Sequence, residues 1–190
     1  YLDTGAYYRT ATLLALRGGI DPADEDAVVT AVEAADLDFD DGAMLLDGSP
    51  VGPALRGSEV TAHVSIVSAH PRLRKVLVAR QRAWVRRRGG AAVVEGRDIG
   101  TVVFPRAPVK VFLTAPEPVR AARRTDDPEA TGRNVEEVAA DLRRRDSYDS
   151  ERTVAPLRPA ADAFVIDTSH LGAGQVADRI LQLVVAGGES

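Results

Sequence analysis

The order of apolar and polar residues along this 190-residue chain predicts strands and helices that alternate. Apolar runs at residues 92–94, 109–113 and 163–167, the second interrupted by Lys110 and the third ended by Asp167, predict strands of a parallel sheet. The first two are expected to be buried, because such strands are covered on both faces. Helical spacing, caps and breakers predict helices over the segments 6–16, 21–35, 58–69, 71–88, 116–124, 134–146 and 176–185. This alternation indicates an α/β fold built on a doubly wound parallel sheet.

The segment 37–53 has a different pattern. Two short apolar runs flank Asp40-Asp41-Gly42, and an Asp-Gly pair between such runs is typical of a β-hairpin. We therefore expect a small antiparallel insert. The helix predicted at 58–69 carries hydroxyl groups at helical spacing, on Thr61, Ser65 and Ser68, which either face water or line a polar site.

The composition excludes several classes of protein. Hydrophobic residues make up 45% and charged residues 27%, which is ordinary for a soluble globular protein of one domain. No apolar run is long enough to span a membrane. The chain has no Cys and three scattered His, so disulfides are excluded and no zinc site is indicated.

The net charge of −4 conceals two segments of opposite sign. Residues 18–55 contain ten acids and no Lys or Arg, whereas residues 60–94 contain eight bases and no acid. Nearly all bases are Arg, whose planar fork suits phosphate well. A nucleotide and a nucleic acid both remain possible partners on charge alone.

Two groups of charged residues are candidates for a site. Arg97 and Asp98 follow the strand at 92–94, and ligands of α/β proteins bind beyond the carboxyl ends of strands. A surface ion pair is the alternative. Arg145, Asp149 and Arg152 share one helix face, where they form either ordinary intrahelical pairs or a clamp for phosphate and sugar hydroxyls.

Four blocks of residues together resemble one enzyme family. The blocks are Thr4-Gly5-Ala6-Tyr7-Tyr8-Arg9, the Ser65 to Arg74 spacing, Glu95-Gly96-Arg97-Asp98-Ile99-Gly100-Thr101-Val102-Val103-Phe104-Pro105, and Arg145-Asp146 with Asp149, Arg152 and Ala155-Pro156-Leu157. They resemble bacterial cytidylate (CMP) kinases from the first residue to the last helix, and the third block is long and highly specific.

The resemblance implies a single P-loop kinase domain of the three-layer αβα class, with a five-stranded parallel sheet. The core would comprise residues 1–20, 89–116 and 155–190. The monophosphate-binding region with its β insert would comprise 21–88, and a mobile helical lid about 117–154. The family's first strand and its G-x-x-x-x-G-K-[ST] phosphate loop are absent from the chain, and we expect them upstream of Tyr1.

The implied reaction transfers the γ-phosphate of ATP, with Mg²⁺, to CMP or dCMP, giving CDP or dCDP. The implied partners are ATP and CMP or dCMP, without nucleic acid or membrane, for an enzyme expected to be monomeric and cytoplasmic. The residues that would read the cytosine are Ser65, Arg74 and Asp98. Those at the CMP phosphate would be Arg9 and Arg97, with Thr4 and Tyr8 beside it.

The remaining residues implied by the resemblance belong to the lid. Arg145, Asp149 and Arg152 would meet the sugar and phosphates, and Arg120 and Arg124 would approach the ATP. Arg97, Arg145 and Arg152 are the implied catalytic residues, and no residue is assigned to a metal. A site made of Arg suits this reaction, because an attacking phosphate needs positioning and charge neutralisation rather than a general base.

Alternative functions stay open at this stage. A related kinase of UMP or AMP would share the fold. An RNA-binding module could use the basic helix at 71–88, although such grooves usually include stacking aromatics and this helix has only Trp84. If the chain is truly truncated before the phosphate loop, it would bind nucleotide without catalysing transfer.

Overall fold

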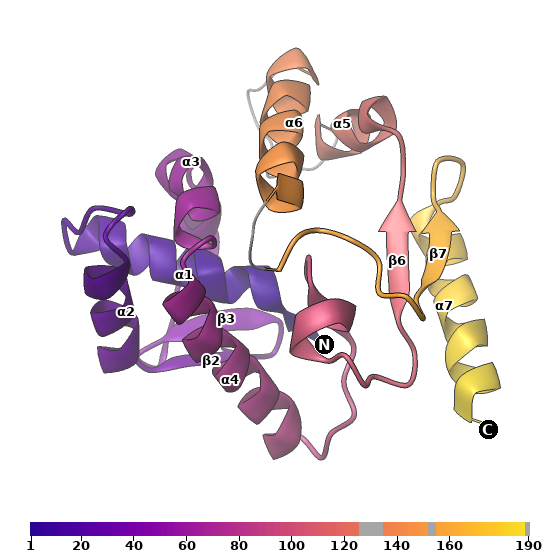
Figure 1. The fold of residues 1–190 in the computed structure, drawn as a ribbon, viewed down its shortest axis with the longest axis horizontal. Helices are drawn as coiled ribbons and strands as arrows, with labels where there is room; N and C mark the ends of the chain where they lie inside the picture. The colour runs from indigo at the N-terminus through magenta and orange to yellow at the C-terminus, as the bar shows by residue number, and fades with distance from the viewer. Residues whose placement is uncertain (126–134, 152–154, 189–190) are drawn as a thin grey trace. The chain divides into compact units, whose positions relative to one another are not determined.

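The computed structural model describes residues 1–125, 135–151 and 155–188, and Figure 1 shows its course. In addition, the side chains of a few residues of α6 and the last residue of α7 are not described. The chain divides into two compact units, the first built on Tyr1–Ile99 and the second on Gly100–Glu151 with the residues from Ala155 onward.

Helices dominate the first unit. They are α1 (Thr4–Arg17), α2 (Glu25–Ala34), a 3-10 helix (Gly52–Arg56), α3 (Ser58–Val67) and α4 (Pro71–Arg87). The α1 helix begins two residues earlier than predicted, because the Asp3 carboxylate caps it by accepting a hydrogen bond from the Ala6 N–H at 3.2 Å. The predicted helices at 58–69 and 71–88 are confirmed to within two residues.

The helix predicted from Asp21 is wrong in its first turn. The Asp21 carboxylate accepts from the Ala23 N–H at 2.9 Å and makes a turn, while Asp24 caps α2 through the Ala27 N–H at 3.0 Å. Two Asp residues three positions apart can each serve as the N-cap. The second one does so here, so the helix starts at Glu25.

The predicted hairpin is confirmed. Strands β2 (Leu37–Asp40) and β3 (Ala43–Leu46) pair antiparallel, with Asp41 and Gly42 at φ 45° and 75° in the turn. Both positive φ values match the turn that Asp-Gly favours. A third strand, β4 (Ser49–Pro50), pairs with β3 and was not predicted.

Parallel pairing is confirmed in each unit. In the first unit β1 (Leu2–Asp3) pairs with β5 (Val94–Glu95), and in the second β6 (Val111–Thr114) pairs with β7 (Phe164–Asp167). The expected complete burial of these strands is wrong: Val93 beside β5 is 69% exposed and Leu113 in β6 is 50% exposed. Each strand is paired with one neighbour among the described residues, so one edge is uncovered.

The second unit begins within a π-helical segment (Ile99–Val103) and continues through α5 (Glu117–Thr125), α6 (Val135–Glu151) and α7 (Ala173–Gly188). Helices α5 and α6 pack side by side (Figure 1), and Arg143 donates to Glu117 at 2.7 Å.

Buried Lys110 donates to Asp162 and to the Pro105 carbonyl, and its hydrogen bond holds the pKa of the Asp162 carboxyl below its usual range. None of the helices in the described residues combines the length and the apolar character that spanning a bilayer requires.

The charge asymmetry of the sequence is largely resolved within the first unit. Arg72 on α4 pairs with Asp26 on α2, while Arg87 pairs with Asp38 at 3.0 Å. Arg88 pairs with Asp40 at 3.1 Å. The basic helix therefore packs against the acidic segment of its own chain, which weakens the RNA-binding alternative.

Trp84 joins α4 to the hairpin, and its truncation is expected to be costly. The indole is 4% exposed, donates its Nε1–H to the Phe39 carbonyl and lies edge-on to the Phe39 ring at 6.2 Å. Trp84→Ala should lower the free energy of unfolding by about 3–5 kcal/mol in urea titrations. Trp84→Phe should cost only about 1 kcal/mol, since the Arg88 guanidinium also donates to that carbonyl at 3.2 Å. Equal losses in both variants would contradict this role.

Candidate nucleotide site

The candidate site is built around the end of β5. The Thr4 hydroxyl, in the first turn of α1, donates to the Glu95 carbonyl at 2.7 Å and is 3% exposed. A Cβ atom on Gly96 would lie 2.2 Å from Thr4 Oγ1 and 2.8 Å from Ile99 Cδ1. This close approach requires glycine and fixes the turn that leads to Arg97 and Asp98.

Gly96→Ala is therefore expected to displace this turn. The added methyl group meets Thr4 and Ile99 at distances that require a backbone shift, so the free energy of unfolding should fall by about 1–3 kcal/mol. Gly174→Ala is the matched control, because a Cβ there meets nothing within 4 Å in α7. Thermal unfolding of the two variants tests this, and equal melting temperatures would contradict it.

A buried ion pair lies directly beyond the turn. Arg74 Nη2 donates to Asp98 Oδ2, and the two side chains are each 6% exposed. Arg74 Nη1 also donates to the Ser68 carbonyl at 2.9 Å. The Arg74 guanidinium carbon lies 5.2 Å from the centre of the Tyr8 ring. Asp98 therefore forms its ion pair with Arg74 in the interior and not at the surface, although the two residues are 24 positions apart in the sequence.

Ser65 is linked to this pair through Ser68. The Ser68 hydroxyl donates to the Ser65 carbonyl at 3.1 Å, and Ser65 itself is half-buried on α3. The hydroxyl stripe of α3 therefore lies partly in the protein rather than in water. Ser68 was missed as a site residue because it contributes its main-chain carbonyl, although its position one turn after Ser65 was already evident.

The arginines predicted at the CMP phosphate are more open. Arg97 is exposed, and Arg9 is half-buried on α1 and donates to the Leu55 carbonyl at 3.2 Å. Their neighbours in sequence, Asp98 and Tyr8, both contact Arg74. The phosphate role of Arg9 and Arg97 stays a prediction, as does direct substrate contact by Thr4.

The comparisons with known proteins match nearly the whole chain to one family. The family model described as Cytidylate kinase matches residues 1–186. This chain belongs to the cytidylate kinase family. Relatives named "Cytidylate kinase" include those of Corynebacterium efficiens, 51% identical over 100% of this chain and 84% of the relative, and Mycobacterium avium, 51% identical over 97% and 83%. That of Mycobacterium leprae is 48% identical over 97% of this chain and 83% of the relative.

The residues predicted for the lid are only partly described, and those that are described belong to the second unit. Arg120 donates from Nε to the Ala115 carbonyl at 3.0 Å, and Arg124 is half-buried on α5. Arg145 and Asp149 belong to α6, but their side chains lie outside the described residues, as does all of Arg152. The predicted N-cap Asn134 and most of the segment 125–133 also lie outside.

Arg123, in the segment predicted as the lid, has a structural role. It donates to the Thr168 hydroxyl at 2.9 Å, to the Thr168 carbonyl and to the Leu171 carbonyl at 3.2 Å. These bonds tie α5 to the loop after β7. The Arg-rich sequence did not distinguish this anchor from its neighbours on the same helix.

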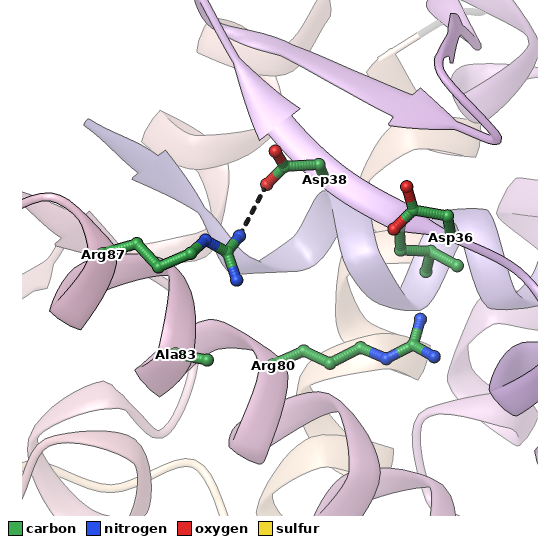
Figure 2. A pocket seen from close by; sticks show the side chains of 6 residues that line it. Asp36, Asp38, Arg80, Ala83 and Arg87 are labelled. Atoms are coloured by element: carbon green, nitrogen blue, oxygen red, sulfur yellow. Dashed lines mark hydrogen bonds and ion pairs between the residues drawn. The ribbon is translucent and has the colours of Figure 1, made fainter.

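A separate hollow of about 400 Å³ lies between β2 and α4. Figure 2 shows the Arg87–Asp38 pair across it, with Arg80 and Asp36 nearby. Arg80 donates to the Val32 and Ala35 carbonyls at 2.9 and 3.1 Å, at the end of α2. None of the predicted site residues line this hollow, and its polar groups hold α4 against α2 and the hairpin.

The described residues do not form a magnesium site of their own. Within residues 1–125, 135–151 and 155–188, no three acidic, His or Cys side chains gather closely enough to hold a metal ion. Mg²⁺ in phosphoryl-transfer enzymes is bound largely by substrate phosphates and waters. No side chain here is assigned to it.

Proposed function

We propose that this protein transfers the γ-phosphoryl group of ATP to CMP or dCMP, giving ADP and CDP or dCDP. The observation that carries the proposal is the buried Arg74–Asp98 pair beside α3. A carboxylate and a guanidinium side by side match the edge of cytosine, which presents an amine donor next to acceptor groups. Uracil reverses this polarity at N3 and O4, so it should fit less well.

Burial makes this pair selective. Polar groups inside a protein that lose their partners carry a large desolvation cost, so a base with the wrong donors is strongly rejected. The Arg74 and Asp98 side chains are each 6% exposed, so we expect the desolvation cost of an unpaired group here to be high. The half-buried Ser65 hydroxyl is the third group of the proposed base site.

The chemistry needs no general base. A phosphate oxygen of CMP attacks the γ-phosphorus, the new P–O bond forms as the bond to the β–γ bridging oxygen breaks, and ADP leaves. The protein's part is to align the reactants and neutralise charge. We assign Arg9 and Arg97 to the acceptor phosphate and Arg145, Asp149 and Arg152 to the sugar and phosphates. Arg120 and Arg124 are assigned to ATP.

The participation of Mg²⁺ is part of the proposal. The ion would neutralise negative charge on the phosphates during transfer. The residue roles assigned above do not depend on which groups bind the ion. We further propose a monomer that works on free nucleotides in the cytoplasm. The alternative is a kinase of UMP or AMP, which the Arg74–Asp98 pair disfavours because it matches the edge of cytosine.

A panel of acceptors tests the proposed function. The full-length natural protein is given ATP and Mg²⁺ with CMP, dCMP, UMP or AMP in turn, and ADP release is followed. We expect the highest kcat/KM for CMP or dCMP. A preference for AMP or UMP would overturn the assignment, and the absence of transfer to any acceptor would favour an inactive nucleotide binder.

A further inference from the structure

We infer that Tyr8 is a positioning residue that sets base specificity by holding Arg74, and not a ligand of the CMP phosphate. The inference rests on the proposed function and deepens it. Tyr8 lies on α1, is 8% exposed, and its ring centre is 5.2 Å from the guanidinium carbon of Arg74. This distance lies within the range of a cation–π interaction.

The Arg74 guanidinium is held by hydrogen bonds and lies over the Tyr8 ring. Along the edge, Nη2 donates to the Asp98 carboxylate and Nη1 donates to the Ser68 carbonyl at 2.9 Å. Hydrogen bonds in the plane fix the direction of a guanidinium, but they leave it able to tilt about the line that joins its acceptors. The Tyr8 ring, with its centre 5.2 Å from the guanidinium carbon, would limit that tilt.

Burial strengthens the contact. Arg74 is 5% exposed, and a cation–π interaction with a desolvated cation is stronger than one at the surface. The main chain at Tyr8 is held inside α1, where its carbonyl accepts from the Thr12 hydroxyl at 2.8 Å, and its side chain is buried. One turn earlier, Thr4 holds the Glu95 carbonyl at 2.7 Å.

The same face of α1 therefore supports both members of the ion pair. Thr4 fixes the strand end that leads to Asp98, and Tyr8 lies against Arg74. Reading a flat base requires donors and acceptors in the plane of that base. An Arg74 free to tilt would still attract nucleotide, but it would distinguish cytosine from uracil less well.

The test compares Tyr8→Leu with Tyr8→Phe in the full-length natural protein. Phe keeps the ring over Arg74 and removes the hydroxyl, whereas Leu keeps apolar volume without an aromatic face. We expect Tyr8→Leu to lower the CMP-over-UMP ratio of kcat/KM by about tenfold, equivalent to 1.4 kcal/mol at 25 °C. It should also raise the KM for CMP and leave the KM for ATP unchanged. Tyr8→Phe should keep the wild-type ratio.

The opposite pattern would overturn the inference. If the Tyr8 hydroxyl bound the phosphate, Tyr8→Phe would weaken CMP and UMP alike, and Tyr8→Leu would leave their ratio unchanged. Tyr8→Trp keeps an aromatic face, so it should keep the wild-type ratio and the wild-type KM for CMP. If the Leu variant does not fold, weaker use of CMP and UMP alike by the Phe and Trp variants would overturn the inference. Wild-type protein that transfers no phosphate to CMP would overturn the proposed function. An active wild type whose CMP-over-UMP ratio is unchanged in Tyr8→Leu would overturn only the role of Tyr8, so the two failures are distinguishable.

Discussion

Arg97→Ala is expected to lower kcat by roughly 10³-fold, the order of magnitude that an arginine at a transferring phosphate contributes. Arg97 is exposed at the end of β5, immediately before buried Asp98, so its charge can reach a ligand while its neighbour stays in the interior. Steady-state rates with saturating CMP and ATP measure the effect. The loss should appear in kcat and also in the KM for CMP, because Arg97 is assigned to the acceptor phosphate, which it would both bind and align for attack.

Arg97→Lys is the matched variant, since it keeps the charge and loses the planar fork. It should recover only part of the rate. Removal of an exposed side chain should leave the melting temperature nearly unchanged, which separates a catalytic loss from a folding defect. A near-normal kcat in Arg97→Ala would refute the role.

Asp98→Ala is expected to relax base choice and to destabilise the fold. The substitution leaves the Arg74 guanidinium buried without its carboxylate, and breaking a buried pair from one side costs about 3–5 kcal/mol. Urea unfolding measures that loss. The ratio of kcat/KM for CMP over UMP should fall, with a smaller effect on kcat than in Arg97→Ala.

The double variant Arg74→Met/Asp98→Ala is the control for the buried charge. It removes both charges, so its free energy of unfolding should be higher than that of Asp98→Ala alone, while base choice stays relaxed. If Asp98→Ala kept both its stability and its preference for CMP, the pair would have neither role.

Local patterns predicted most of the fold. The Asp41-Gly42 turn and the helix at 71–88 follow from short-range chemistry, and the structure has them as expected. The start of α2 could not be chosen, because Asp21 and Asp24 are equally good caps. The burial of β5 was overestimated, because an apolar run gives no information on how many neighbours a strand has.

The charged segments show the same limit. The sequence displays an acidic stretch and a basic helix, but whether such charges meet a ligand or one another depends on tertiary packing. The structure pairs Arg72, Arg87 and Arg88 with acids of the same chain. Arg74, only two positions from Arg72, instead turns inward to Asp98, and no composition or charge count distinguishes the two.

The residues of the candidate site were predicted from motif resemblance more than from physical reasoning, and their roles stay predictions. Ser65, Arg74 and Asp98 were expected at one base, and the structure brings Arg74 and Asp98 into contact. The contributions of the Ser68 carbonyl and the Tyr8 ring were not predicted. Main-chain acceptors and ring faces leave no distinctive trace in a sequence, because every residue has a carbonyl and most buried aromatics only fill space.

The most direct test of the base site is the affinity of the full-length protein for CMP and UMP, measured by calorimetry without ATP. The wild type should bind CMP at least about tenfold more tightly than UMP, a difference of about 1.4 kcal/mol or more. Asp98→Ala should bind the two nucleotides with nearly equal affinity. Equal affinity for CMP and UMP in the wild type, or tighter binding of UMP, would contradict base reading by Arg74 and Asp98.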